Sequence, residues 1–292
     1  MKEIDDKPLY SLGLNKRGTT QMTTTVKQSG CLIEVTEHNK LQKSYKRNGG
    51  RKPRVEQSLY NQDDKHASEV KLHSIKNTIR TFKRYVFANF SVRFTMLTLT
   101  FNANCDFDIA DVSICREKFN LYWKNLSRTK ALEGIDFQYL GVQEFQNNGH
   151  IHFHILCHLP QRFNAIIKTK WKHGHADLRH STKDPLSTKK IANYLSKGIF
   201  DDRLANEKHR YLRSKVLKKP ISLTTENNKI KDFLLQRNSE IWYSFESEYG
   251  FNYTAFISDV TMDELESFAA NAVENDVLMM LEKLESITQD YK

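Results

Sequence analysis

A strand that carries two histidines on one face constrains the fold of this chain more than any other feature. Residues 149–156 read GHIHFHIL. In a β-strand, residues two apart point to the same face, so His152 and His154 leave one face while Phe153 and Ile155 enter the core. The alternation therefore predicts a half-buried strand whose polar face bears two imidazoles.

An Asn-Asn-Gly sequence just upstream predicts the partner of this strand. These residues tolerate positive φ, so segments 139–146 and 150–157 are expected to form a hairpin. If the pairing is symmetric about Asn148, Glu144 faces His152 and projects from the same face as both histidines. Two imidazoles and one carboxylate then converge, which is a set of metal ligands.

The mixed nitrogen and oxygen donors suit Mn²⁺ and also admit Mg²⁺, with open positions left for water and phosphate oxygens. A lone His-x-His pair can also be an ordinary polar strand face, and His150 has the same parity as the other two histidines. Structural zinc is not expected, because the four cysteines form no C-x-x-C pair and are predicted to be reduced thiols.

A second motif lies downstream, in a helix predicted over residues 187–196 and ended by Gly198. Tyr194 and Lys197 are three residues apart and therefore share one helix face. A phenol there is a candidate nucleophile, with the ammonium as its charge partner. The alternative is a buried tyrosine beside a lysine whose stem covers apolar surface.

A strand with the sequence FTMLTLTF at residues 94–101 precedes both motifs. Together, and in this order, the three resemble the motifs of HUH (histidine–hydrophobic–histidine) endonucleases, specifically rolling-circle replication initiators of plasmids and phages with a single catalytic tyrosine. WKHG at 171–174 and LKKP at 217–220 resemble further segments of these proteins. The resemblance covers roughly Phe94 to Pro220. Thr98 and Thr100 share a strand face and are interpreted as structural, with support of the metal face as the alternative.

The resemblance implies roles for five residues. Glu144, His152 and His154 would hold a divalent metal, Mg²⁺ or Mn²⁺, whereas His150 would be solvated or lie behind the ligands. Tyr194 would attack a phosphodiester to give a 5′-phosphotyrosyl intermediate, and Lys197 would stabilise the developing charge.

The implied function is nicking and rejoining of single-stranded or hairpin DNA at the replication origin of a bacterial plasmid, phage or integrated element. No Gly-x4-Gly-Lys-Ser/Thr motif is present, so unwinding would need a host helicase, and elongation a host polymerase. With one motif tyrosine, termination would use a second protomer of a homo-oligomer, water, or Tyr194 again. The alternatives are a relaxase or tyrosine transposase of the same superfamily, or a non-catalytic nucleic-acid-binding protein.

Charge supports a nucleic-acid partner. The net charge is +10, although the last 34 residues hold nine acidic side chains against two lysines, so the rest of the chain is more basic still. Basic residues near Tyr194 are predicted to contact phosphates. They are Lys189, Lys190, Arg210, Arg213, Lys218 and Lys219.

Strand, helix, hairpin, helix, strand and helix follow one another between residues 93 and 196, which predicts an α+β fold with a central antiparallel sheet and helices on one face. Resemblance implies the ferredoxin-like (RRM-like) HUH palm. A helix at 68–90 is expected before it, and a helix at 227–237 and a hairpin of 242–246 with 251–257 after it.

Three regions are predicted. Residues 1–66 form a basic, largely flexible arm that either clamps DNA or is a solvated tail, and 67–258 form the endonuclease domain with a C-terminal elaboration. Residues 259–292 form an acidic amphipathic helical tail that either packs or competes for the DNA groove. No apolar stretch approaches a bilayer span, so we expect a soluble, cytoplasmic bacterial protein without a membrane partner.

Overall fold

The computed structural model describes residues 23–38, 64–91, 93–181, 185–204, 209–226, 228–247 and 250–271, the side chains of 64–70 and 185–187 excepted. The chain divides into two compact units. Unit 1 combines Met1–Tyr60 with Pro220–Lys292, and unit 2 is the continuous segment Asn61–Lys219. Unit 2 is thus inserted into the sequence of unit 1.

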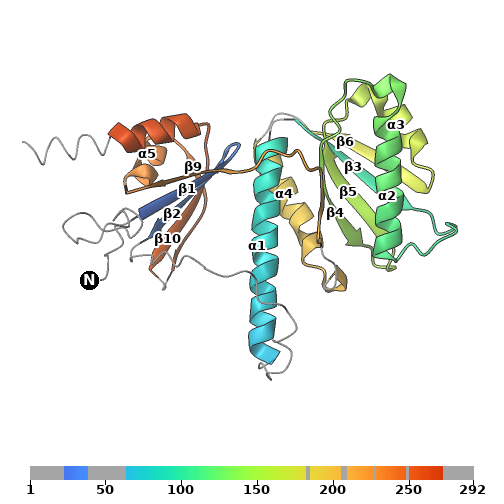
Figure 1. The fold of residues 1–292 in the computed structure, drawn as a ribbon, viewed down its shortest axis with the longest axis horizontal. Coiled ribbons are helices and arrows are strands. Elements are labelled where there is room, and N and C mark those ends of the chain that lie inside the picture. Colours follow the sequence, from blue (N-terminus) through green and yellow to red (C-terminus); the bar gives the residue numbers. More distant parts are fainter. Residues whose placement is uncertain are drawn as a thin grey trace, which may run out of the picture. The chain divides into compact units, whose positions relative to one another are not determined.

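The elements alternate between helices and strands along unit 2 (Figure 1). Its helices are α1 (Asp64–Phe90), α2 (Val112–Ser127), α3 (Asn164–Lys170) and α4 (Pro185–Ile199), with the short 3-10 helices η3 (Lys130–Leu132), η4 (Gln161–Phe163) and η5 (Asp202–Leu204). Its strands are β3 (Thr95–Phe101), β4 (Tyr139–Phe145), β5 (Ile151–Cys157), β6 (Gly174–His180) and β7 (Leu212–Arg213).

The strands of unit 2 form one antiparallel sheet in the order β6-β3-β5-β4-β7. Their burial alternates, as in β3, where every second residue from Thr95 to Phe101 is buried. Leu97, Leu99, Phe153 and Ile155 consequently face a single hydrophobic core.

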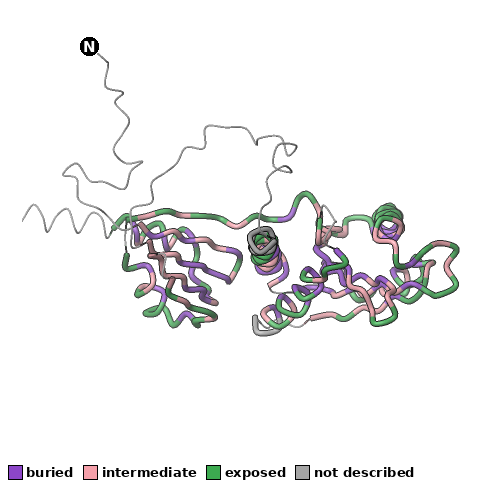
Figure 2. The backbone as a smooth tube through the Cα atoms, turned by 90° about the horizontal axis from the view of Figure 1, so that it is seen from below, coloured by how far each residue is buried: buried purple, intermediate pink, exposed green. Residues whose placement is uncertain are grey.

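Helices α2 and α3 cover this apolar face (Figure 1). Helix α2 begins at its N-cap Asp111, whose carboxylate accepts hydrogen bonds from two backbone amides of the first turn. From α2, Phe119 packs against Phe153, with ring centroids 5.2 Å apart, and Trp123 packs against Tyr139. Figure 2 shows the buried backbone segments gathered along these strands and helices.

The opposite face of the sheet is covered in part by α4, which packs on β4 and on α1. Gly198 lies inside α4, which continues to Ile199; the prediction that Gly198 ends the helix was wrong. A Cβ at this position would lie 3.3 Å from the carbonyl oxygen of Gln143 and 3.5 Å from Cγ2 of Val142. Glycine therefore allows the close approach of helix and strand.

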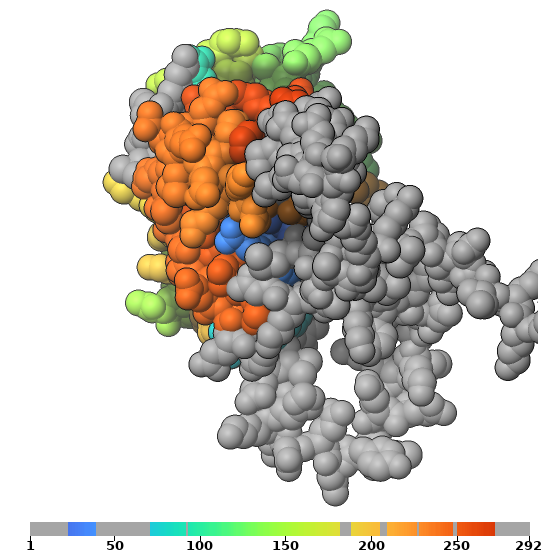
Figure 3. All heavy atoms as spheres, turned by 90° about the vertical axis from the view of Figure 1, so that its left-hand side faces the viewer, coloured from blue at the N-terminus to red at the C-terminus, as the bar shows by residue number. Residues whose placement is uncertain are grey.

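Unit 1 is built on a second antiparallel sheet, in the order β8-β1-β2-β10-β9. Its strands are β1 (Thr23–Ser29), β2 (Leu32–His38), β8 (Ile221–Thr225), β9 (Glu240–Ser247) and β10 (Phe251–Ile257), and its helices are α5 (Ile230–Gln236) and residues 262–271. Figure 3 shows the N-terminal strands, in blue, enclosed by C-terminal segments in orange and red.

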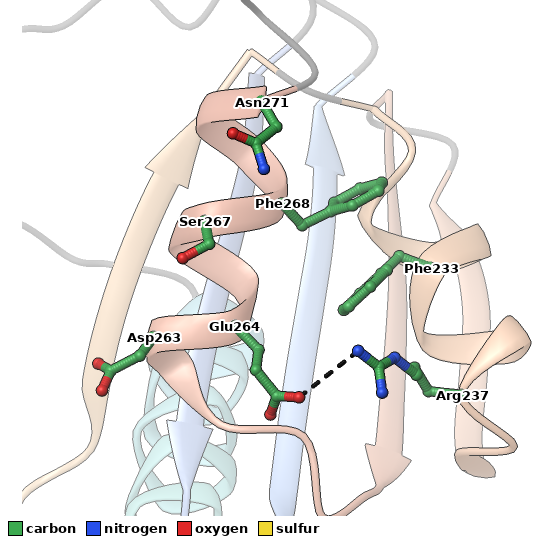
Figure 4. Close-up of a pocket in the computed structure, with 7 residues that line it drawn as sticks. All are labelled: Phe233, Arg237, Asp263, Glu264, Ser267, Phe268 and Asn271. Atoms are coloured by element: carbon green, nitrogen blue, oxygen red, sulfur yellow. Dashed lines mark ion pairs between the residues drawn. The ribbon is translucent and has the colours of Figure 1, made fainter.

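The two helices of unit 1 pack on one face of this sheet around Val26, Ile33 and Phe256. Between them, Phe233 and Phe268 stack with ring centroids 4.3 Å apart, and Arg237 lies 3.6 Å from Glu264 (Figure 4). The hollow at this helix pair is a small cavity of about 380 Å³.

The α+β class and the antiparallel palm-like sheet are confirmed, as is the hairpin of β9 with β10. The structure differs from the expected single sheet with helices on one face, because a second sheet is present and α4 packs opposite α2.

The expected flexible arm over 1–66 is corrected at residues 23–38, which form β1 and β2 and contribute Val26, Ile33 and Val35 to a core. Their partner strands β8 and β10 are distant in sequence. The rest of the arm up to residue 63 and the tail from residue 272 lie outside the described residues. In the described part of the chain, no helix is long and apolar enough to cross a membrane.

Candidate metal centre and nucleophile

The β4–β5 hairpin sets the register of the site. Glu144 pairs directly with His152, and Val142 with His154, as symmetry about Asn148 requires. Gly149 adopts a φ of 82° in the turn, and the Gln146 amide donates to the His150 carbonyl at 2.8 Å. The turn therefore places the carboxylate and both imidazoles on one face.

The three predicted ligands lie together. One ligand atom from each of Glu144, His152 and His154 can be chosen so that all lie within 4.8 Å of one another. Oε2 of Glu144 is 3.5 Å from Nε2 of His152 and 3.2 Å from Nε2 of His154. This cluster could hold a metal ion.

The environment of the ring nitrogens fits a cation. Both Nε2 atoms are buried, and neither has a hydrogen-bond partner among the residues that the structure describes. Nδ1 of His154 lies 3.1 Å from the Thr98 hydroxyl, and Nδ1 of His152 lies 3.4 Å from the Gln146 amide. When these two groups accept the Nδ1 protons, with the Gln146 amide turned accordingly, both Nε2 lone pairs point towards Glu144.

Burial also keeps His154 in the ligating form. Its desolvation, followed by the nearby His152, lowers the pKa of His154 to about 4, although the Glu144 carboxylate acts in the opposite direction. The imidazole is therefore neutral at pH 7, and a neutral imidazole is the form that binds metals.

Tyr194 projects from α4 over the same face of the sheet. Its ring lies edge-on to His154, with centroids 5.6 Å apart, and 45% of the residue is exposed. Burial and the Glu144 carboxylate raise the pKa of the phenol, while Arg179 acts to lower it. The phenol is thus protonated at neutral pH and accessible to a large substrate.

Two exposed lysines flank the phenol on α4. Lys190 lies four residues before Tyr194 and Lys197 three residues after it, so all three share one helix face. The helix is held in place by α1, where Nζ of Lys83 donates to Oδ1 of Asn193 at 2.7 Å. This places one phenol between two ammonium groups beside the metal-ligand cluster.

The other basic residues predicted to contact DNA occupy different environments. Lys189 is half-buried, whereas the side chains of Lys218 and Lys219 are exposed. Arg210 donates to the carbonyls of Ile199 and Asp201, so its guanidinium fastens the C-terminal end of α4.

The guanidinium of Arg213 lies 5.2 Å from the centre of the Tyr85 ring and donates to the Ser214 carbonyl. Arg213 and Tyr85 come from β7 and α1, so this contact joins a strand to the long helix.

Arg179 and Gln146 were not predicted from the sequence. Arg179 is brought to Tyr194 by the pairing of β6 with β3, opposite Met96. Its position in the β6 strand, two residues after Asp177 with matching parity, is the only sequence signal that points to this face. The parity of Gln146, two residues after Glu144, likewise placed it on the ligand face.

An antiparallel α+β unit with a two-histidine, one-carboxylate cluster on a sheet face, and a helix tyrosine beside it, has the organisation of the HUH replication initiators that the motifs resemble. In agreement, residues 94–199 match the model of a family described as replication-associated protein, of the ORF2 type.

The matched span runs from just before β3 to the end of α4 and contains all the elements of the site. The resemblance stated from the motifs is therefore confirmed, and it indicates a replication-initiator role, with DNA as the expected partner. Neither the curated proteins nor the solved structures provide a match.

Proposed function

We propose that this protein initiates rolling-circle replication by nicking and rejoining single-stranded DNA at an origin, with a divalent metal and a 5′-phosphotyrosyl intermediate. The observation that carries the proposal is the edge-on contact of the Tyr194 ring with His154, itself 3.2 Å from Glu144. A phosphate that contacts the cluster therefore lies within reach of the phenol.

Glu144, His152 and His154 would hold the ion, Mg²⁺ or Mn²⁺. When bound, such an ion supplies Lewis-acid stabilisation of phosphate charge. The two neutral imidazoles and the carboxylate leave coordination positions for phosphate oxygens.

Tyr194 forms the new bond. Its phenol oxygen attacks phosphorus and loses its proton to solvent, the bond from phosphorus to the 3′ oxygen breaks, and that oxygen takes up a proton to leave a free 3′-hydroxyl. Lys197 places positive charge beside the phenol as its oxygen develops charge. In rejoining, a 3′-hydroxyl attacks the phosphotyrosyl phosphorus and the phenol is released, so the bond energy is conserved without ATP.

A host helicase would open the duplex and a host polymerase would extend the free 3′ end. One motif tyrosine means that termination uses a second protomer, water or Tyr194 again. A relaxase or tyrosine transposase would use the same chemistry on a transfer origin or on element ends, and a non-catalytic DNA-binding protein would form no adduct.

Adduct formation tests the proposal. We expect the wild-type chain, incubated with Mn²⁺ and a randomised pool of single-stranded oligonucleotides, to form a covalent adduct that survives denaturing electrophoresis. Tyr194→Phe should form none, because it lacks the nucleophilic oxygen. Tyr243→Phe, at another exposed tyrosine, should behave as wild type. An adduct that persists in Tyr194→Phe, or in the presence of EDTA, would contradict the mechanism.

The sequence captured in the adduct then separates the alternatives. Placed on a plasmid without its own origin, it should support replication when this protein is supplied. Support of conjugative transfer or of excision instead would assign the protein to the relaxases or transposases.

A further inference from the structure

A hollow of about 300 Å³ opens beside the proposed nucleophile, at the lower end of the roughly 300–1,000 Å³ typical of ligand pockets. Its lining comes from β3, β6 and α4, all within unit 2. The residues that matter for its chemistry are Phe94, Met96, Arg179, Lys190, Ile191 and Tyr194. We call it the tyrosine groove.

One wall of the tyrosine groove is fixed by hydrogen bonds. Nδ1 of His180 lies 2.8 Å from the Thr95 hydroxyl, and its Nε2 lies 3.1 Å from Oδ1 of Asn164. The Ser181 amide donates to the Phe94 carbonyl at 2.9 Å. The groove is thus formed by paired backbone and a tethered imidazole, so its shape is largely set before a ligand arrives.

The lining combines apolar surface with positive charge. Met96 and Ile191 are half-buried and offer apolar contact, and Tyr194 adds an aromatic ring. Arg179 is exposed, with its Nε 3.2 Å from Oδ2 of Asp177, and Lys190 is exposed one turn before the tyrosine on α4. A ligand that matches this lining has a flat apolar part and a neighbouring anion.

We propose that the tyrosine groove holds one nucleotide directly next to the scissile phosphate, with its base against Met96 and Ile191 and its phosphate beside Arg179 and Lys190. The inference rests on the proposed nicking function and adds to it a base-reading subsite. A phosphate-only contact would not need the apolar floor, and a nucleotide supplies both parts at the required spacing.

The proposal predicts that one base matters far more than its neighbours. Removing a base that stacks on protein side chains costs about 1–3 kcal/mol, which is roughly 5- to 150-fold in affinity. The loss should come from a single position flanking the nick, because the hollow is at the lower end of the ligand-pocket range.

An abasic scan measures this. The Tyr194→Phe chain, which cannot react, is titrated with Mn²⁺ and with fluorescent copies of the oligonucleotide that the wild type captures, each lacking one base. We expect a loss of roughly 5- to 150-fold at one position next to the nick. In Tyr194→Phe/Met96→Ser the loss at that position should shrink to less than about twofold, because the floor is gone.

Two further variants separate the roles of apolar and charged groups. Arg179→Gln should weaken binding of intact and abasic oligonucleotides alike, because it removes a phosphate contact. Lys215→Gln, at an exposed lysine that is not among the lining residues, should leave the abasic pattern unchanged. Unchanged thermal unfolding and Mn²⁺ affinity of each variant establish that the fold is intact.

The outcomes are distinguishable from failure of the nicking function. If the wild type forms adducts but no flanking base matters, or the loss persists in Met96→Ser, the subsite is overturned and nicking stands. If the wild type forms no adduct, nicking fails, and a long thymidine oligonucleotide compared with its fully abasic counterpart tests the groove alone. Equal loss with and without Met96 would then overturn it.

Discussion

The two ring nitrogens of His154 have different neighbours. Nε2 faces Glu144, whereas Nδ1 lies 3.1 Å from the hydroxyl of Thr98 on the adjacent strand, where the two residues are directly paired. A hydrogen bond at Nδ1 fixes both the tautomer and the orientation of a ligating imidazole. Thr98 therefore has a positioning role that threonine's general frequency in strands would not reveal.

We expect Thr98→Val, which keeps the shape and removes the hydroxyl, to weaken Mn²⁺ binding about 10- to 100-fold. Isothermal titration calorimetry of the chain without DNA measures this directly. Thr100→Val is the matched control, because Thr100 points to the same face opposite His152 and, within the described residues, has no hydrogen bond to a site histidine. Equal affinity of the two variants would remove Thr98 from the site.

Removal of a ligand should have a larger effect. His154→Gln or Glu144→Gln is expected to abolish measurable Mn²⁺ binding, since two remaining protein ligands hold a divalent ion weakly. His150→Gln, in the turn and bonded to Asn148, should bind Mn²⁺ as wild type does. Loss of binding in His150→Gln would exchange the two histidines' assignments.

Protonation of His154 links the site to stability. Its folded pKa of about 4 lies below the ordinary value near 6.5, so between these two pH values the unfolded chain binds a proton that the folded chain does not. Stability without metal therefore falls as pH decreases from about 6.5 to 4. This group should contribute a loss of about 2 kcal/mol between pH ~7 and pH ~5.

Urea unfolding at the two pH values, in the presence of EDTA, checks this. His154→Asn should lose about 2 kcal/mol less than wild type over that interval. An equal loss in both proteins would show that His154 is not kept neutral by its surroundings.

Residues with a local pattern were predictable. Glu144, His152 and His154 followed from hairpin symmetry and strand parity, and the structure brings them together. Arg179 was not predictable from its neighbours, because only the long-range pairing of β3 with β6 brings it to Tyr194.

At the scale of elements, helix α4 determines where the phenol lies. Its approach to β4 depends on Gly198, and its C-terminal end on the hydrogen bonds from Arg210. A displaced α4 would move Tyr194 without touching the metal ligands. The two parts of the site can therefore be uncoupled by mutation.

We expect Gly198→Ala to change stability little, because a gain of about 1 kcal/mol in helix propensity offsets the 3.3 Å contact with the Gln143 carbonyl. Gly198→Val adds branched bulk at that contact and should destabilise by about 1–3 kcal/mol. It should also slow adduct formation at least about tenfold while Mn²⁺ affinity stays within about twofold. Parallel loss of metal binding would mean that α4 and the hairpin are not independent.

Most elements of unit 2 were predicted because each has its own period of hydrophobic residues, such as the alternating burial of β3. The strands β1 and β2 were missed although Gly30 and the β-branched residues around it gave a hairpin signal. Their neighbours β8 and β10 come almost two hundred residues later, so no local pattern showed that they belong to a sheet.

At the scale of the whole molecule, residues 61–219 form a continuous unit with its own core and all the residues of the proposed site. We expect this fragment alone to fold, to bind Mn²⁺ and to form the Tyr194 adduct at a rate within about tenfold of the full chain. Circular dichroism and the adduct assay check this. A fragment that unfolds, or folds without reacting, would show that unit 1 contributes to the chemistry.

Unit 1 is assembled from both sides of this insertion, and that order has a consequence during translation. The ribosome finishes the unit with the proposed site while β1 and β2 still lack β8, β9 and β10, so Val26 and Ile33 stay uncovered and two edges stay unpaired. A late frameshift or stop codon would therefore leave a nascent chain with a complete metal-and-tyrosine unit attached to a sticky, half-made sheet. Messages damaged near their 3′ end would be more harmful to the host than those cut short early.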